Sequence, residues 1–129
     1  MQELTAEYTK RIHGYNSGIE LAEFRDEQRM LQAAERVGGK LVLLSSRGRE
    51  FSSEQFANFI RDNQDSAVSQ LTFGIGPHDG FSDRTRGCAR LLLSLGAMTL
   101  PHELARVVLL EQIYRAYTIL KGHPYHLGH

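Results

Sequence analysis

Apolar side chains in this chain recur first at the spacing of a helix and later in short runs. Leu4, Tyr8 and Ile12 lie four residues apart, which predicts a helix over residues 2–13. Short runs of apolar and β-branched residues, bounded by polar or glycine-containing segments, predict strands of a parallel sheet. The predicted strands are Ile19–Phe24, Lys40–Leu44, Val68–Gly74 and Ser94–Met98.

The segments between these strands carry helix start and stop signals. Ser52 with Gln55 three residues later is typical of a capping box, and Pro101 suits a first helical turn. The predicted helices are Arg25–Val37, Ser52–Asn63, Ser82–Leu92 and Pro101–Lys121, with polar loops over Ser46–Glu50 and Ile75–Gly80. Alternating strands and helices predict one α/β domain over residues 1–129, with a mostly parallel sheet in three layers.

The last predicted helix is apolar on nearly every side. Its apolar residues are Leu104, Ala105, Val107, Val108, Leu109, Leu110, Ile113, Tyr114, Ala116, Tyr117, Ile119 and Leu120. A helix that is apolar all round is buried all round. In a small domain, this favours one face on the sheet and another on a second subunit, so we expect a homodimer. The alternative is a helix wrapped wholly by its own chain.

Composition excludes several classes of protein. No run of about 18 apolar residues occurs, which argues against a membrane span, and the charged start MQELTAEYTKR does not resemble a signal peptide. The single cysteine, Cys88, cannot form an internal disulfide, which favours a reducing cytoplasm. Its place among Ala89 and Leu91 predicts a small buried helical residue and not a nucleophile.

Charge is balanced overall but unevenly distributed. The 15 Lys and Arg residues equal the 15 Asp and Glu residues in number, which argues against binding to nucleic acid by bulk charge alone. The part from residue 84 onward has six basic residues (Arg84, Arg86, Arg90, Arg106, Arg115, Lys121) and only two acidic ones (Glu103, Glu111). This asymmetry suggests an anionic partner for the C-terminal part, although ordinary surface charge could also cluster in this way.

Two glycine-containing loops follow predicted strands, Gly74–Gly80 and Leu95–His102. Glycines beyond the carboxyl end of a strand let a ligand approach the backbone, and ligands of open α/β sheets bind at that edge. Neither loop has the spacing of a dinucleotide-binding motif or a P-loop. Taken alone, the first loop is better explained as a tight turn, and the second as a strand, a loop and a helix that starts at a proline.

A longer pattern joins the second loop to the C-terminal tail. The residues M-T-L-P-H-x-L-x-R-V-x-x-x-E-x-x-Y-R-A-x-x-I-x-x-x-H-P-Y-H, from Met98 to His126, resemble the C-terminal signature of the large-subunit ribosomal RNA methyltransferase H family. Members of that family methylate N3 of a pseudouridine in 23S rRNA and belong to the SPOUT superfamily, whose α/β fold has a C-terminal trefoil knot. The resemblance is close over 73–126 and extends, more loosely, to 40–59.

Two departures from the family pattern change what the resemblance implies. Family members open with a strand before the first helix, so we expect the family's first strand to be absent here. The family has two adjacent glycines where this chain has Ile75-Gly76, with one extra residue before Gly80.

The resemblance implies S-adenosylmethionine as cofactor. The matching cofactor-binding positions are Leu44, Gly76, Leu95, Gly96, Ala97, Met98, Thr99 and Leu100. These residue types suit an apolar adenine slot with backbone hydrogen-bonding groups. For the three leucines, simple core packing is the alternative interpretation.

The resemblance further implies that Arg115, His123, Tyr125 and His126 face the RNA. Arginine can hold a phosphate with two hydrogen bonds, and tyrosine can stack on an unpaired base. We expect Arg115 and His126 to be catalytic, with His126 assisting loss of the proton from the ring nitrogen. His123, His126 and His129 without acidic or cysteine partners make a poor metal site, so no metal is expected.

Two other functions compete with a 23S rRNA methyltransferase. The missing strand and altered glycine loop would also fit an RNA- or ribosome-binding protein on the same scaffold that has lost catalysis. A knotted methyltransferase with another RNA target is the third hypothesis.

Overall fold

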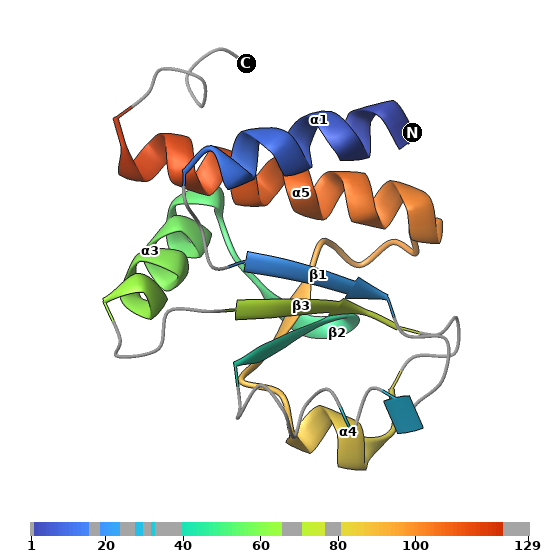
Figure 1. Cartoon of the computed structure of the whole chain (residues 1–129). Coiled ribbons are helices and arrows are strands. Elements are labelled where there is room, and N and C mark those ends of the chain that lie inside the picture. Colours follow the sequence, from blue (N-terminus) through green and yellow to red (C-terminus); the bar gives the residue numbers. More distant parts are fainter. Residues whose placement is uncertain are drawn as a thin grey trace. The chain divides into compact units, whose positions relative to one another are not determined.

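The computed structural model describes residues 2–15, 19–23, 28–29, 32, 40–65, 71–76 and 81–122 (Figure 1). Its strands are β1 (Ile19–Glu23), β2 (Leu41–Glu50), β3 (Leu71–Ile75) and β4 (Leu91–Ser94), and its helices are α1 (Gln2–His13), α3 (Ser53–Gln64), α4 (Asp83–Gly87) and α5 (His102–Leu120). The chain divides into two compact units. The helical unit comprises Met1–Ser17, Phe51–Ser69 and Glu103–His129, and the sheet unit comprises Gly18–Glu50 and Gln70–His102.

The sheet unit contains four strands in the order β1-β3-β2-β4, and every pairing is parallel. Leu41, Val42 and Leu43 of β2 are fully buried, as are Leu71 and Phe73 of β3. Parallel strands that are buried on both faces need continuous apolar runs, which is why the runs in the sequence identified them. The predicted α/β class with a parallel sheet is therefore confirmed.

The second strand is longer than the apolar run that predicted it. Ser46–Glu50 was expected as a polar loop, and this expectation was wrong because β2 continues to Glu50. The strand shifts its register after Leu44 and returns to β4, where Arg49 and Glu50 pair with Leu93 and Ser94. Strand pairing uses backbone groups, so a half-exposed segment can continue a ladder with polar side chains.

The fourth strand lies where a helix was expected. The helix predicted over Ser82–Leu92 ends at Gly87, and residues 91–94 form β4 in place of the predicted strand Ser94–Met98. A short apolar run such as Leu91–Leu93 suits a helix or a buried strand equally well, so the pattern alone could not decide. Cys88 consequently caps α4 and is exposed, which corrects the prediction of a buried helical residue.

The helical unit begins its second helix with the predicted capping box. Ser52 Oγ accepts a hydrogen bond of 3.1 Å from the Gln55 backbone, while the Ser52 backbone donates one of 2.9 Å to Gln55 Oε1. Two N–H groups at the start of α3 are thereby satisfied. The predicted helix at 2–13 and the predicted final helix are confirmed as α1 and α5.

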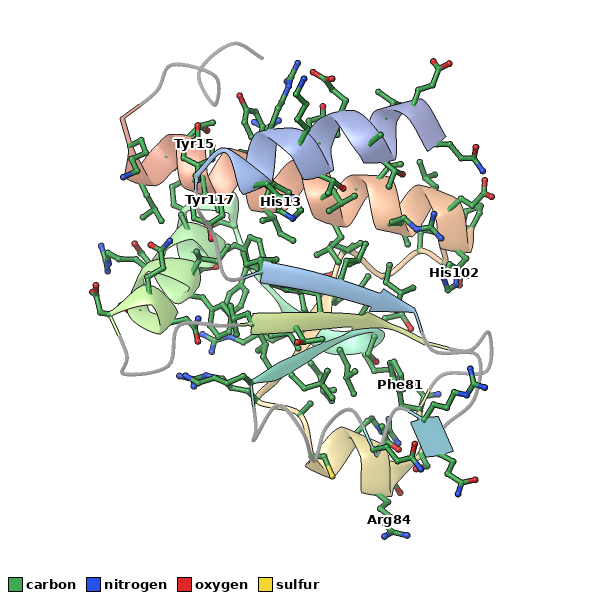
Figure 2. All side chains as sticks on the ribbon, in the orientation of Figure 1. His13, Tyr15, Phe81, Arg84, His102 and Tyr117 are labelled. Carbon is green, nitrogen blue, oxygen red and sulfur yellow. The ribbon has the colours of Figure 1, made fainter. Side chains whose placement is uncertain are left out.

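Aromatic side chains join α1 to α5 within the helical unit. Tyr15 stacks on Tyr117 with ring centroids 5.2 Å apart, and Tyr8 lies 6.0 Å from Tyr114. Figure 2 labels Tyr15 and Tyr117. The guanidinium of Arg11 lies 5.4 Å from the Tyr114 ring and 5.6 Å from the Tyr8 ring, a range in which cation–π attraction acts. Burial raises the pKa of Tyr15 above its usual value, and Tyr114 raises it further.

Three expectations fall partly or wholly outside the described residues. Most of the predicted helix Arg25–Val37 lies there, as do residues 68–70 of the third predicted strand and most of the loop before Gly80. In the part of the chain that the structure describes, no helix is long and apolar enough to cross a membrane.

Gly48 allows the shifted part of β2 to approach β4. A Cβ atom at this position would lie 2.6 Å from both the carbonyl carbon and the oxygen of Leu92, which are backbone atoms. We therefore expect Gly48→Ala to lower the free energy of unfolding by about 1–3 kcal/mol in urea titration. Gly87→Ala is the matched control, because nothing lies within 4 Å of its added Cβ. Equal stability of the two variants would contradict the close approach.

Candidate functional site

The predicted cofactor residues come from three adjacent strands of the sheet unit. Leu44 pairs with Leu93 of β4, and its neighbour Leu43 pairs with Gly74 of β3. Gly76 directly follows β3, and Leu95 directly follows β4. Leu44, Gly76 and Leu95 therefore lie at nearly the same level of the sheet, beside the carboxyl ends of β3 and β4. Ligands of open α/β sheets bind at this edge.

The loop after β4 presents apolar groups to solvent. The Met98 side chain is 83% exposed, and Ala97 and Thr99 are exposed beside it. Gly96 adopts a φ of +140°, a conformation that other residues rarely adopt, and nothing lies within 4 Å of the position a Cβ would take. An exposed apolar loop with open space at its glycine fits a ligand that carries an apolar ring.

Gly76 has a close neighbour that the sequence pattern did not indicate. A Cβ atom added to Gly76 would collide with Cε1 and Cζ of Phe81, the residue two positions before α4. Figure 2 labels Phe81 in the sheet unit. A side chain at this position would therefore require the Phe81 ring to move, whether or not a ligand also approaches the backbone of Gly76.

Arg115 belongs to the other unit. It lies on α5, where its Nε and Nη2 donate to Glu111 Oε1 at 2.9 and 2.5 Å. Both side chains are largely buried, with 17% and 18% of their surfaces exposed. Because the pair is largely removed from water, its electrostatic attraction is screened less than that of a surface pair. This attraction and the two hydrogen bonds restrict the orientation of the Arg115 guanidinium.

The Arg115–Glu111 pair is connected to α3. The second oxygen of Glu111 accepts a hydrogen bond of 2.9 Å from Gln112 Nε2, and Ser53 Oγ donates to Gln112 Oε1 at 3.1 Å. Ser53 is the first residue of α3, directly after the Ser52 cap. The start of α3 and the Arg115 guanidinium are thus linked through side chains of α5.

Other predicted site residues are not tested by the structure. His123, Tyr125 and His126 lie outside the described residues, as does His129. Among the residues that are described, no group of three or more His, Cys, Asp or Glu side chains could hold a metal ion.

Comparison with known proteins identifies the family. The profile of a family described as "Predicted SPOUT methyltransferase" matches residues 1–126. The chain belongs to the SPOUT methyltransferase family. This confirms the superfamily that the Met98–His126 motif indicated.

Three relatives in this family carry the name "Ribosomal RNA large subunit methyltransferase H". The protein from Koribacter versatilis (strain Ellin345) is 49% identical over 134 residues, covering 100% of this chain and 90% of the relative. The protein from Deinococcus radiodurans is 42% identical and covers 95% of this chain and 86% of the relative. The protein from Geobacter sp. (strain M21) is also 42% identical, with 93% and 85% covered. The resemblance to this group is therefore confirmed across the chain.

Three features of the site escaped the sequence prediction. The Phe81 contact could not be found from spacing, because it depends on where the residues directly before α4 lie relative to the end of β3. Glu111 could have been found, since it lies four residues before Arg115 on a predicted helix. Ser94, a hydroxyl at the end of a leucine run, was assigned to a strand without a further role.

The Gly76–Phe81 contact allows a test of whether glycine at position 76 serves ligand binding or only the packing of Phe81. We expect Gly76→Val to weaken binding of S-adenosylmethionine by about tenfold or more in calorimetry, because the added side chain must displace the Phe81 ring beside the proposed site and narrows the space left for a ligand. The variant Gly76→Val/Phe81→Ala removes the collision with the ring. Binding should stay weak if the ligand itself needs the space. Recovery of wild-type affinity would mean that Gly76 serves only the packing of Phe81.

Proposed function

We propose that this chain is an S-adenosylmethionine-dependent methyltransferase that acts on N3 of a pseudouridine in 23S ribosomal RNA. One observation carries the proposal: Leu44 of β2, Gly76 directly after β3 and the loop from Leu95 directly after β4 lie side by side at the carboxyl ends of β3 and β4. The substrate is taken from relatives that are named as large-subunit ribosomal RNA methyltransferases.

The residues at the sheet edge fit the proposed cofactor chemically. Leu44, Leu95 and Leu100 offer apolar surface, and Gly96 leaves its backbone open to approach, while Gly76 packs against the Phe81 ring. Ala97, Met98 and Thr99 complete the proposed binding segment. When bound, S-adenosylmethionine supplies the electrophilic methyl group of a sulfonium. The chain itself would hold the cofactor and exclude water from the donor.

Arg115 is the proposed contact to the RNA. Its guanidinium is oriented by Glu111 and can engage a phosphate through charge-assisted hydrogen bonds. His123, Tyr125 and His126 complete the proposed RNA site by stacking and hydrogen bonding. His126 would accept the proton that N3 loses, and Arg115 would hold the nucleotide through its phosphate.

We further propose that the chain acts in the cytoplasm as a homodimer of single SPOUT domains, each with a C-terminal trefoil knot. The proposal for a dimer rests on α5. Val107, Leu109, Leu110, Ile113 and Ala116 are buried, while Leu104 is 37% exposed and Val108 and Ile119 are partly exposed. An apolar helix with such a partly exposed stripe would be covered by the second copy.

Methyl transfer to rRNA is the direct test of the proposed function. Ribosomes from a strain lacking this gene should gain a methyl group at N3 of one 23S pseudouridine when incubated with the protein and S-adenosylmethionine. Arg115→Ala should lower the methylation rate by about a hundredfold and leave cofactor affinity unchanged, since a charge-assisted contact to RNA is lost. Mass mapping of rRNA fragments gives the rate and the position.

Two further variants keep this test decisive. Arg115→Ala/Glu111→Gln also replaces the buried carboxylate that loses its arginine partner in the single variant, and Arg61→Ala removes a more exposed arginine of α3. Full activity of the Arg115 variants would remove Arg115 from the site. Cofactor binding without methylation of any 23S fragment would favour another RNA target. No cofactor binding at all would favour an RNA-binding protein without catalysis.

The dimer is tested by sedimentation equilibrium. The wild type should sediment at twice the mass of one chain, and Val108→Lys should weaken association by placing a charge on the partly exposed stripe of α5. Asn58→Lys adds the same charge to an exposed position of α3 and should leave association unchanged. The mass of a single chain at every concentration would contradict the dimer.

A further inference from the structure

Ser94 is a buried hydroxyl at the carboxyl end of the sheet, between two segments proposed to hold the cofactor. It is the last residue of β4, and only 6% of its surface is exposed. The proposed cofactor loop begins at the next residue, Leu95. Buried hydroxyls in proteins are normally hydrogen-bonded, so their partners indicate which segments they connect.

The partners of Ser94 are backbone groups on either side of the proposed site. Its Oγ accepts a hydrogen bond of 3.1 Å from the Gly96 backbone N–H and donates one of 3.0 Å to the Gly96 carbonyl oxygen. The carbonyl of Ser46 lies 3.4 Å from the same Oγ, as an alternative acceptor for its one proton. Gly96 belongs to the loop after β4, and Ser46 lies two residues beyond Leu44 on β2.

Gly96 is the point of the loop that most needs such a partner. Its φ of +140° lies in a region that glycine adopts about as readily as negative φ, so the backbone is not confined to this conformation. Nothing lies within 4 Å of its Cβ position. No neighbouring atom therefore packs against the side of Gly96 where a Cβ would lie. The two hydrogen bonds from Ser94 determine the direction in which the loop leaves the strand, and they occupy the Gly96 N–H.

We propose that Ser94 is a positioning residue for S-adenosylmethionine: its hydroxyl holds the loop Leu95–Leu100 in the binding conformation before the cofactor arrives. The proposal rests on the proposed function of this loop. A loop that is already ordered loses less conformational entropy on binding, so the hydroxyl contributes to affinity without touching the ligand.

Ser94→Ala removes the hydroxyl with little change of volume. We expect its affinity for S-adenosylmethionine in calorimetry to fall about tenfold, because the loop must be ordered on binding and the Gly96 N–H loses its acceptor. Ser94→Thr retains a hydroxyl at the same atom and should recover most of the affinity. Ser45→Ala is the matched control, since the hydrogen bond of 3.3 Å that Ser45 Oγ accepts comes from the Arg47 backbone within β2 itself.

A second measurement without ligand separates this inference from the proposed function. Amide hydrogen exchange of the segment that contains Gly96 should accelerate in Ser94→Ala but not in Ser45→Ala, at an unchanged unfolding temperature. Unchanged exchange and unchanged affinity in Ser94→Ala would overturn the role of Ser94. If the wild type binds no S-adenosylmethionine, the proposed function and the positioning role both fail. Accelerated exchange would then show only that Ser94 holds the loop.

Discussion

The double pairing of β2 with β4 is the constraint on which the sheet edge depends. Leu93 is the register partner of Leu44 before the shift and of Arg49 after it. The residues between them must therefore leave the ladder and return to it within a few positions. Gly48 makes the return possible, because a side chain there would strike the Leu92 backbone. The excursion brings the Ser46 carbonyl within reach of Ser94 at the end of β4.

The division into two units assigns different physical tasks to different parts of the chain. The sheet unit contributes backbone, glycine and apolar surface at the carboxyl edge, which suits a ligand recognised by shape and by a few hydrogen bonds. The helical unit contributes Arg115, whose charge is balanced by Glu111 in a largely buried pair. Such a pair adds little to the overall field of the protein. Its role in RNA binding would be directional, and attraction at long range would come from the other basic residues after residue 84.

Sequence patterns predicted the elements whose signals are local. The capping box at Ser52 and the four-residue spacing of α1 depend on neighbouring residues alone, and both are present in the structure. The run Leu91–Leu93 was assigned to a helix because burial, which decides between helix and strand there, depends on β2 being alongside. The same limit explains why Ser46–Glu50 was taken for a loop. In both cases a partner distant in sequence determined the local conformation.

The motif in the sequence predicted which residues belong to the candidate site. It did not predict the physical reason for which each residue type is found there. Gly76 and Gly96 are both glycines after a strand, yet they are constrained by opposite conditions. Gly76 is crowded by the Phe81 ring, whereas Gly96 is unpacked and adopts a positive φ. A substitution at the first therefore acts through volume, and one at the second through backbone conformation. Only the crowded glycine can be compensated by removing a neighbour, while the unpacked one depends on the hydrogen bonds that Ser94 provides.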